Sequence, residues 1–198
     1  MSTRARMPLR DAVVVVRDAR RDEDVVISSM GTAREWMSMG PLHERDFVFV
    51  PSAMGHATSL GLGIALAQPE RRVIVLSGDG SLLMSLGSLV TIAAAAPPNL
   101  TVVLFDNGVY EVTGGQKTPG SLVPSGVDFA AMARAAGIAS VHRWSAIDDW
   151  RSAAVEALTA RGPTLIVLDV APVPGAAGPR SPGPTADRAK KFAAALRA

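Results

Sequence analysis

The sequence predicts an α/β protein with a three-layer, doubly wound and mostly parallel sheet that helices cover on both faces. Short apolar runs alternate with helical stretches along the chain, as in repeated strand-helix units. The runs are apolar throughout, which is typical of strands buried on both faces. With 198 residues, 48% of them hydrophobic, the chain can bury a sizeable core. We therefore expect one domain over residues 1–171.

The expected elements follow from apolar runs, helical periodicity and helix-breaking residues. Strands are expected at residues 25–28, 47–50, 73–77, 100–105, 141–144 and 164–170. Helices are expected at residues 9–18, 32–39, 55–67, 81–96, 129–136 and 148–160. A loop is expected at residues 114–126, which are rich in Gly, Pro and Ser. Residues 172–198 are expected to form a Pro-, Gly- and Ala-rich connector and a short helix, which either docks on a partner or hangs free.

Composition and charge exclude several classes of function. The net charge is +2 and the basic residues are scattered, so we expect no nucleic-acid partner. The chain has no cysteine, which excludes disulfides, thiolate nucleophiles and cysteine-held metal clusters and is compatible with a reducing cytoplasm. The apolar stretch at residues 12–16 is too short for a signal peptide or a membrane span. We therefore expect a cytoplasmic protein.

Two polar clusters follow predicted strands, at the edge of the sheet where doubly wound folds bind ligands. They are Gly78-Asp79-Gly80-Ser81 and Asp106-Asn107-Gly108. Gly80 allows a ligand close to the backbone, and Ser81 is expected to begin a helix whose free N–H groups favour a phosphate. Asp79 and Asn107 offer the oxygen ligands that Mg²⁺ takes together with phosphate oxygens. The clusters predict a magnesium diphosphate site.

The Gly-Asp-Gly motif, the Asn that follows Gly80 after 26 residues, and their positions at consecutive strand ends resemble the motif of thiamine diphosphate (ThDP) enzymes. The resemblance implies ThDP and Mg²⁺ as cofactors, bound by the diphosphate-binding domain of that family. It implies that Asp79, Asn107 and the backbone carbonyl of Val109 hold the metal. Many relatives have Asn-Asn where this chain has Asp106-Asn107, but the metal-binding second position is intact.

Two further segments resemble the sulfopyruvate and phosphonopyruvate decarboxylase branch of the family. In residues 51–67, the resemblance implies that Met54 supports the bent cofactor and that the carbonyl of Ser52 accepts from its aminopyrimidine. Residues 107–116, which include Tyr110, resemble the loop that closes over the cofactor. Thr32 is a candidate diphosphate contact, although its spacing from the preceding glycine is one residue short.

His56 and Glu111 are the ionisable groups nearest the inferred pocket. Either could move protons during decarboxylation. The competing interpretations are a histidine that caps the helix and a glutamate that faces solvent. A sulfonate or phosphonate substrate would require a cation, which Arg34 or Lys117 could supply if their loops face the pocket.

The family resemblance also implies a partner. ThDP enzymes use a second, pyrimidine-binding domain whose glutamate activates the cofactor, and the strands of this chain are all assigned to one sheet. We therefore expect a separate pyrimidine-binding subunit, a hetero-oligomer with at least two copies of each chain, and a small 2-oxoacid substrate.

Three other functions remain open. The first is another split ThDP enzyme, either an acetolactate synthase-like carboligase or the beta subunit of a 2-oxoacid oxidoreductase. The absence of cysteine argues against the oxidoreductase, whose beta subunits commonly carry iron–sulfur ligands. The second is a nucleotide-binding regulatory module, suggested by Gly61 and Gly63, which however fall inside a predicted helix. The third is a non-catalytic subunit that has lost the cofactor, against which the presence of Asp79 and Asn107 argues.

Overall fold

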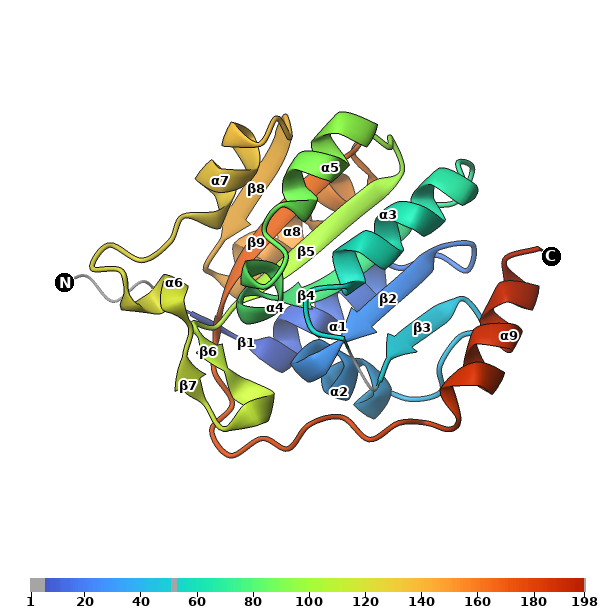
Figure 1. Ribbon diagram of the computed structural model, residues 1–198, viewed down its shortest axis with the longest axis horizontal. Helices are drawn as coiled ribbons and strands as arrows, with labels where there is room; N and C mark the ends of the chain where they lie inside the picture. Colours follow the sequence, from blue (N-terminus) through green and yellow to red (C-terminus); the bar gives the residue numbers. More distant parts are fainter. Residues whose placement is uncertain (1–5, 51–52, 198) are drawn as a thin grey trace.

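A seven-stranded sheet forms the centre of the molecule in the computed structural model, which describes residues 6–50 and 53–197 (Figure 1). Its strands are β1 (Met7–Pro8), β2 (Val25–Ser29), β3 (Asp46–Phe49), β4 (Val73–Gly78), β5 (Leu100–Asp106), β8 (Ser140–Trp144) and β9 (Thr164–Ala171). The strand order is β1-β9-β5-β4-β2-β3, and β8 also pairs with β9. All these pairs are parallel. Parallel strands place their carboxyl ends at one edge of the sheet.

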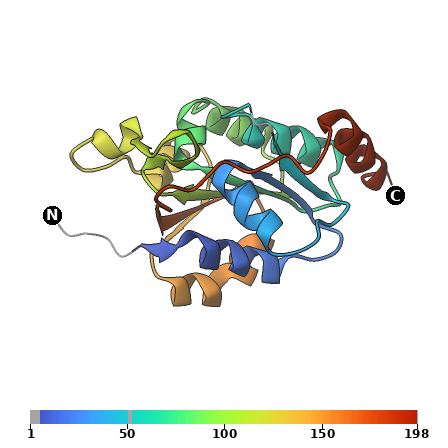
Figure 2. The ribbon, with the colours of Figure 1, turned by 90° about the horizontal axis from the view of Figure 1, so that it is seen from below.

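Helices cover both faces of the sheet, as the sequence predicts (Figure 2). One face carries α1 (Leu9–Ala19), α2 (Met30–Ser38) and α8 (Ile147–Thr159), and the other carries α3 (Ala57–Ala67), α5 (Ser88–Ala95) and α7 (Phe129–Ala135). Successive strand residues contribute to opposite clusters: Ile27 is buried with one set of helices and Val26 with the other. This two-sided burial is why the strands are apolar throughout.

The prediction of one continuous helix over residues 81–96 is wrong, because this segment forms two separate helices. A short helix, α4 (Asp79–Leu83), precedes a turn, and α5 begins at Ser88. Gly55 explains the break: its N–H donates to Ser81 Oγ over 2.8 Å, and its carbonyl accepts from Ser85 Oγ. These contacts hold the segment between the helices against the start of α3.

Residues 109–122, which overlap the start of the loop expected at residues 114–126, form short regular elements. β6 (Val109–Tyr110) and β7 (Gln116–Lys117) pair antiparallel, and a 3₁₀ turn, η1 (Glu111–Thr113), lies between them. α6 (Pro119–Leu122) follows. Gly114 and Gly115 reverse the chain with φ of 127° and 76°, a conformation that glycine tolerates best. The glycines that suggested a loop therefore form the turn of a small hairpin.

The last helix, α9 (Thr185–Ala195), packs on the domain's own edge strand β3 rather than hanging free. The Phe192 ring lies 5.0 Å from the Phe47 ring, between centroids. Arg188 donates to the carbonyl of Val48 over 2.6 Å and also to the carbonyl of Val50. Residues 172–184 cross below the sheet to reach it (Figure 1). In the described ranges, every helix is too short or too polar to cross a membrane.

Candidate functional site

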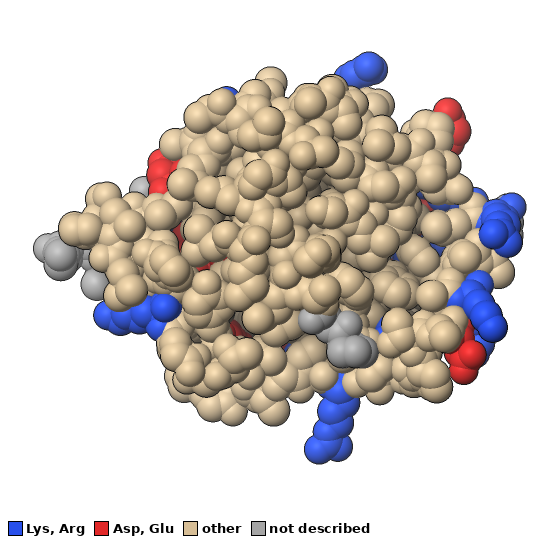
Figure 3. Space-filling model, in the orientation of Figure 1, with Lys and Arg blue, Asp and Glu red and all other residues tan. Residues whose placement is uncertain are grey.

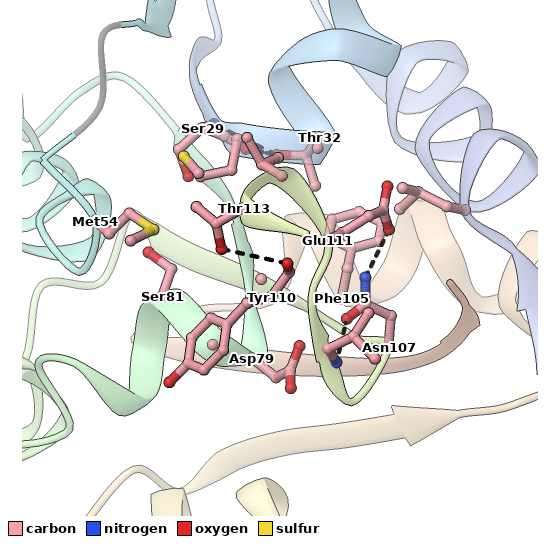
Figure 4. A pocket seen from close by; sticks show the side chains of 17 residues that line it. Ser29, Thr32, Met54, Asp79, Ser81, Phe105, Asn107, Tyr110, Glu111 and Thr113 are labelled. Carbon is pink, nitrogen blue, oxygen red and sulfur yellow. Dashed lines mark hydrogen bonds between the residues drawn. The ribbon is translucent and has the colours of Figure 1, made fainter. Parts of the chain in front are cut away.

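The two predicted polar clusters meet at the carboxyl ends of β4 and β5. These strands are neighbours, with Gly78 paired to Phe105, so the residues that follow them lie side by side. Asp79 and Asn107 line the same pocket (Figure 4). The other predicted site residues on its wall are Thr32, Met54, Gly78, Gly80, Ser81, Val109, Tyr110 and Glu111. The structure therefore brings together most of the residues selected from sequence motifs.

Asp79 is the most perturbed acid of the pocket. Its side chain is buried, with 1% of the residue exposed, and its pKa is raised to about 6, mainly by this burial. The nearby Asp106 carboxylate contributes to this rise, whereas hydrogen bonds from Thr118 Oγ1 and from the backbone N–H groups of Gly80 and Asn107 oppose it. A buried carboxylate that is difficult to ionise alone favours a bound cation.

Asn107 and Glu111 form a second polar unit in the pocket. Asn107 Nδ2 donates to Glu111 Oε2 over 2.8 Å, and Asn107 Oδ1 accepts from the Val109 N–H over 3.0 Å. Glu111 Oε1 accepts from Arg34 Nη2 over 2.7 Å. The Glu111 side chain is 7% exposed, so the interpretation that it faces solvent is wrong.

The Arg34 guanidinium is therefore paired with a carboxylate of the same chain. It also donates to Glu35 Oε1 over 2.9 Å. Burial lowers the pKa of Arg34, but the hydrogen bonds and charges of Glu111 and Glu35 outweigh burial and raise it above its ordinary value. Lys117, the other cation considered for the substrate, lies exposed on β7. Neither side chain lines the pocket.

The loop after β5 covers the pocket. Tyr110, Val112 and Thr113 all line it, and Figure 4 shows Tyr110 beside Asp79 and Ser81. A Cβ added to Gly80 would lie 2.6 Å from Tyr110 Cε1, so glycine is required for this close approach. This covering is what a site that excludes water needs.

The remaining predicted residues are placed less favourably. Thr32 lines the pocket, but its hydroxyl donates to the carbonyls of Ser29 and Leu76 within the capping of α2. Ser81 lies in the first turns of α4, which begins at Asp79 rather than at Ser81. His56 is exposed at the start of α3, outside the pocket wall, and its side chain makes no capping hydrogen bond. Ser52 lies outside the described residues.

Sequence reasoning missed several residues that line the pocket or contact Asp79 from outside its wall. Thr118 Oγ1 donates to Asp79 Oδ2 over 3.0 Å from a segment expected to be featureless loop. Met30 lines the pocket with a φ of 54°, an uncommon conformation for a side chain of its size. Leu9 and Phe105 add apolar walls. No local motif marks these residues, since tertiary packing alone brings them to the pocket.

The donor set fits a divalent cation that a ligand helps to hold. Within residues 6–50 and 53–197, no three His, Asp or Glu side chains converge to hold a metal by themselves. Asp79 and Asn107 offer two oxygen-bearing side chains, and Mg²⁺ characteristically combines such a pair with phosphate oxygens. Asp79 and Glu111 are the charged side chains of the pocket wall.

Comparisons with known proteins agree with this geometry. Residues 28–168 match the family model described as thiamine pyrophosphate enzyme, C-terminal TPP binding domain. The chain is 46% identical over 149 residues to a phosphonopyruvate decarboxylase of Streptomyces hygroscopicus, covering 74% of this chain and 35% of that protein. It is 31% identical over 150 residues to a sulfopyruvate decarboxylase subunit beta of Methanococcus maripaludis, covering 76% of this chain and 77% of that one.

A solved structure is also similar. The thiamine diphosphate-dependent 4-hydroxybenzoylformate decarboxylase of Rhodococcus jostii RHA1 superposes with a TM-score of 0.70 at 27% identity, covering 86% of this chain and 34% of that one. The chain thus spans about a third of the length of these two decarboxylases, 35% and 34%. The family match covers both polar clusters and both strands that carry them. The chain belongs to the thiamine pyrophosphate enzymes, as a C-terminal TPP-binding domain.

Proposed function

We propose that this chain holds the magnesium diphosphate end of ThDP in a 2-oxoacid decarboxylase of the sulfopyruvate or phosphonopyruvate type. A separate pyrimidine-binding subunit completes the active site in this proposal. The observation that carries it is the meeting of Asp79 and Asn107 in one covered pocket at the carboxyl ends of β4 and β5.

The charge of the pocket supports a metal-bridged anion. Its wall carries the carboxylates of Asp79 and Glu111 and no Lys or Arg side chain among the described residues. A diphosphate would be repelled by such a wall unless a divalent cation lay between them. Asp79, Asn107 and the Val109 carbonyl are the proposed ligands of that cation.

The cofactor, when bound, supplies the electron sink for cleaving the carbon–carbon bond of a 2-oxoacid. The residues of this chain position and shield it. Gly80 leaves space for the Tyr110 ring to pack against the backbone, and Met54 lines the pocket wall where a bent cofactor would rest. Tyr110 and Val112 cover the pocket and restrict water.

An uncharged face adjoining the pocket supports the partner subunit. Residues 47–69 and 80–105 contain no Lys, Arg, Asp or Glu, although they include α3 and α5 at the surface. Figure 3 shows this face almost without charge, with charged side chains at its rim. Leu66, Met84 and Val90 are 56%, 47% and 59% exposed. A helix exposed to solvent normally carries charged or polar side chains on its outer side. The uncharged face formed by α3 and α5 is therefore suited to contact with a protein partner.

The uncharged face of α3 and α5 adjoins the pocket. Met54 lies on the pocket wall just before α3, and Ser81 lies on it within α4, which leads to α5. A subunit packed on α3 and α5 would therefore reach the cofactor site. Similarity to a decarboxylase subunit named beta supports a separate chain in this position.

The cation that recognises a sulfonate or phosphonate is assigned to the partner. Arg34 is paired with Glu111 and Glu35, and Lys117 does not line the pocket. An anionic substrate group of this kind requires a basic side chain, ideally the planar fork of an arginine.

Binding to the purified chain tests the cofactor assignment. Tyr110 is the one tyrosine of the sequence, so selective ¹³C-tyrosine labelling gives a single ring to follow by NMR. ThDP should shift this signal only when Mg²⁺ is present, and Asp79→Ala should abolish the shift. Asp149→Ala, an exposed acid on α8, serves as the control. Unchanged Mg²⁺-dependent binding by Asp79→Ala would overturn the metal assignment.

Isolation of the tagged chain from its native cells in Mg²⁺ buffer tests the partner. Mass spectrometry should find a second chain with a pyrimidine-binding domain, together with bound ThDP, and 2-oxoacids can then be screened on the complex. If the chain is recovered alone and binds no added ThDP, the catalytic proposal fails.

A further inference from the structure

The amide of Asn107 has two chemically different ends, and only one can face a cation. Its Oδ1 can accept or coordinate, whereas its Nδ2 can only donate hydrogen atoms. An amide rotated by half a turn would present N–H groups to the metal. The residues that fix this rotation therefore decide whether the site can bind a cation.

Glu111 fixes the rotation through an acceptor. Its Oε2 lies 2.8 Å from Asn107 Nδ2, and an ionised carboxylate accepts hydrogen bonds but donates none. The end of the amide that faces Glu111 must therefore be the NH₂ group. Asn107 Oδ1 accepts from the Val109 N–H over 3.0 Å, which requires the same rotation. A carbonyl oxygen has two lone pairs, so Oδ1 keeps one for a cation.

Glu111 is itself held by two other parts of the chain. Arg34 Nη2, from α2, donates to its Oε1 over 2.7 Å, and the Val173 N–H, just after β9, donates to its Oε2 over 3.3 Å. Arg34 Nη1 also donates to the carbonyl of Ala177 over 3.2 Å. The glutamate is thus connected to α2 and to the segment that follows the last strand of the sheet.

We infer that Glu111 is a positioning residue that holds the Asn107 amide with its oxygen toward the metal, while Arg34 keeps Glu111 in place. The inference rests on the proposed function, since it concerns the same Mg²⁺-diphosphate site. It assigns Glu111 a role other than proton transfer, because both of its carboxylate oxygens already accept hydrogen bonds.

Glu111→Gln tests the inference with almost no change in shape. The Arg34 cation should retain the oxygen end of the new amide, which leaves the NH₂ end facing Asn107. Two NH₂ groups cannot hydrogen-bond to each other, so Asn107 should rotate and present its own NH₂ to the metal. Affinity for Mn²⁺ in the presence of ThDP, followed by electron paramagnetic resonance, should fall about 10- to 100-fold.

Asn107→Asp provides the matched background. A carboxylate has oxygen at both ends, so its rotation does not matter. In the Asn107→Asp background, Glu111→Gln should therefore not lower the Mn²⁺ affinity, because the new NH₂ group can donate to one carboxylate oxygen, which the Glu111 carboxylate could not do, while the other oxygen faces the metal. An equal loss in both backgrounds would overturn the positioning role, as would undiminished affinity of the single variant Glu111→Gln.

A measurement without metal separates this inference from the proposed function. In ¹⁵N-labelled protein, the side-chain amide of Asn107 should show a hydrogen-bonded proton that Glu111→Gln removes. If the wild-type chain, with or without its partner, binds no Mn²⁺ with ThDP, the proposed function fails, and the amide signal alone decides the orientation. If the metal binds but the amide signal is identical in both proteins, Glu111 does not orient Asn107.

Discussion

Thr118 donates its hydroxyl hydrogen to Asp79 Oδ2 over 3.0 Å, although 39 residues separate them in the chain. Thr118 has no exposed surface, and its hydrogen bond lowers the pKa of Asp79 against the opposing effect of burial. The threonine therefore helps to keep the proposed metal ligand ionised.

Thr118→Val removes this donor with little change in volume. We expect the pKa of Asp79 to rise above about 6, because one of the hydrogen bonds that stabilise its ionised form is lost. Mg²⁺ affinity in the presence of ThDP should fall several-fold at a pH near that value, measured by calorimetry. Thr118→Ser retains the hydroxyl and serves as the control. Equal affinity of the Val and Ser variants would contradict this role.

The raised pKa of Asp79 makes the metal-free protein less stable as pH rises. In the folded protein, the Asp79 carboxyl has a pKa of about 6, whereas the ordinary pKa of an aspartate is 3.8. Between these values the folded state binds more protons than the unfolded state, so the free energy of unfolding falls with rising pH.

Asp79→Asn should remove this loss of stability at higher pH, because asparagine does not ionise. At neutral pH without Mg²⁺, the variant should exceed the wild type in free energy of unfolding by roughly 1–3 kcal/mol, and the gain should vanish at the acid end of the window. Urea unfolding at both pH values measures the difference. A constant difference across the window would contradict the assigned pKa.

Gly80→Ala should displace the cover of the pocket. The added Cβ would lie 2.6 Å and 2.7 Å from two carbons of the Tyr110 ring, closer than side chains pack, so the ring must move. We expect the Tyr110 NMR signal to shift and ThDP affinity to fall. Gly63→Ala is the control, since nothing lies within 4 Å of its added Cβ. An unmoved tyrosine signal in Gly80→Ala would show that the cover does not depend on glycine.

The uncharged face can be tested with a pair of matched valines. Val90 on α5 is 59% exposed, and Val155 on α8, at the opposite face of the sheet, is 62% exposed. Val90→Lys should reduce recovery of the partner subunit, because a charge would be buried at the interface. Val155→Lys should leave recovery unchanged. If both variants recover the partner like the wild type, the partner binds elsewhere.

The docking of α9 on β3 predicts a local effect of Phe192→Ala. Phe192 is 8% exposed and packs on Phe47, so its removal should loosen α9 without unfolding the sheet. Hydrogen exchange of residues 185–195 should accelerate, while that of β4 and β5 should not. Lys191→Ala, an exposed neighbour, is the control. Unchanged exchange in α9 would mean that Phe192 contributes little to the docking.

The α/β class, the central strands and the pair Asp79 and Asn107 could all be predicted from the sequence. Buried parallel strands must be apolar on both sides, and this constraint appears directly as continuous apolar runs. The pair could be predicted because parallel strand ends lie at one edge of a sheet, so that two polar clusters after neighbouring strands must meet there.

The side chains that support that pair are evident only in the folded protein. Thr118 reaches Asp79, Arg34 reaches Glu111, and Gly55 breaks the expected long helix through hydrogen bonds between distant segments. Periodicity and motifs report local preference and burial, whereas such hydrogen bonds depend on where the folded chain brings a donor beside an acceptor. For the same reason, α9 could be predicted as a helix, but its place on β3 could not.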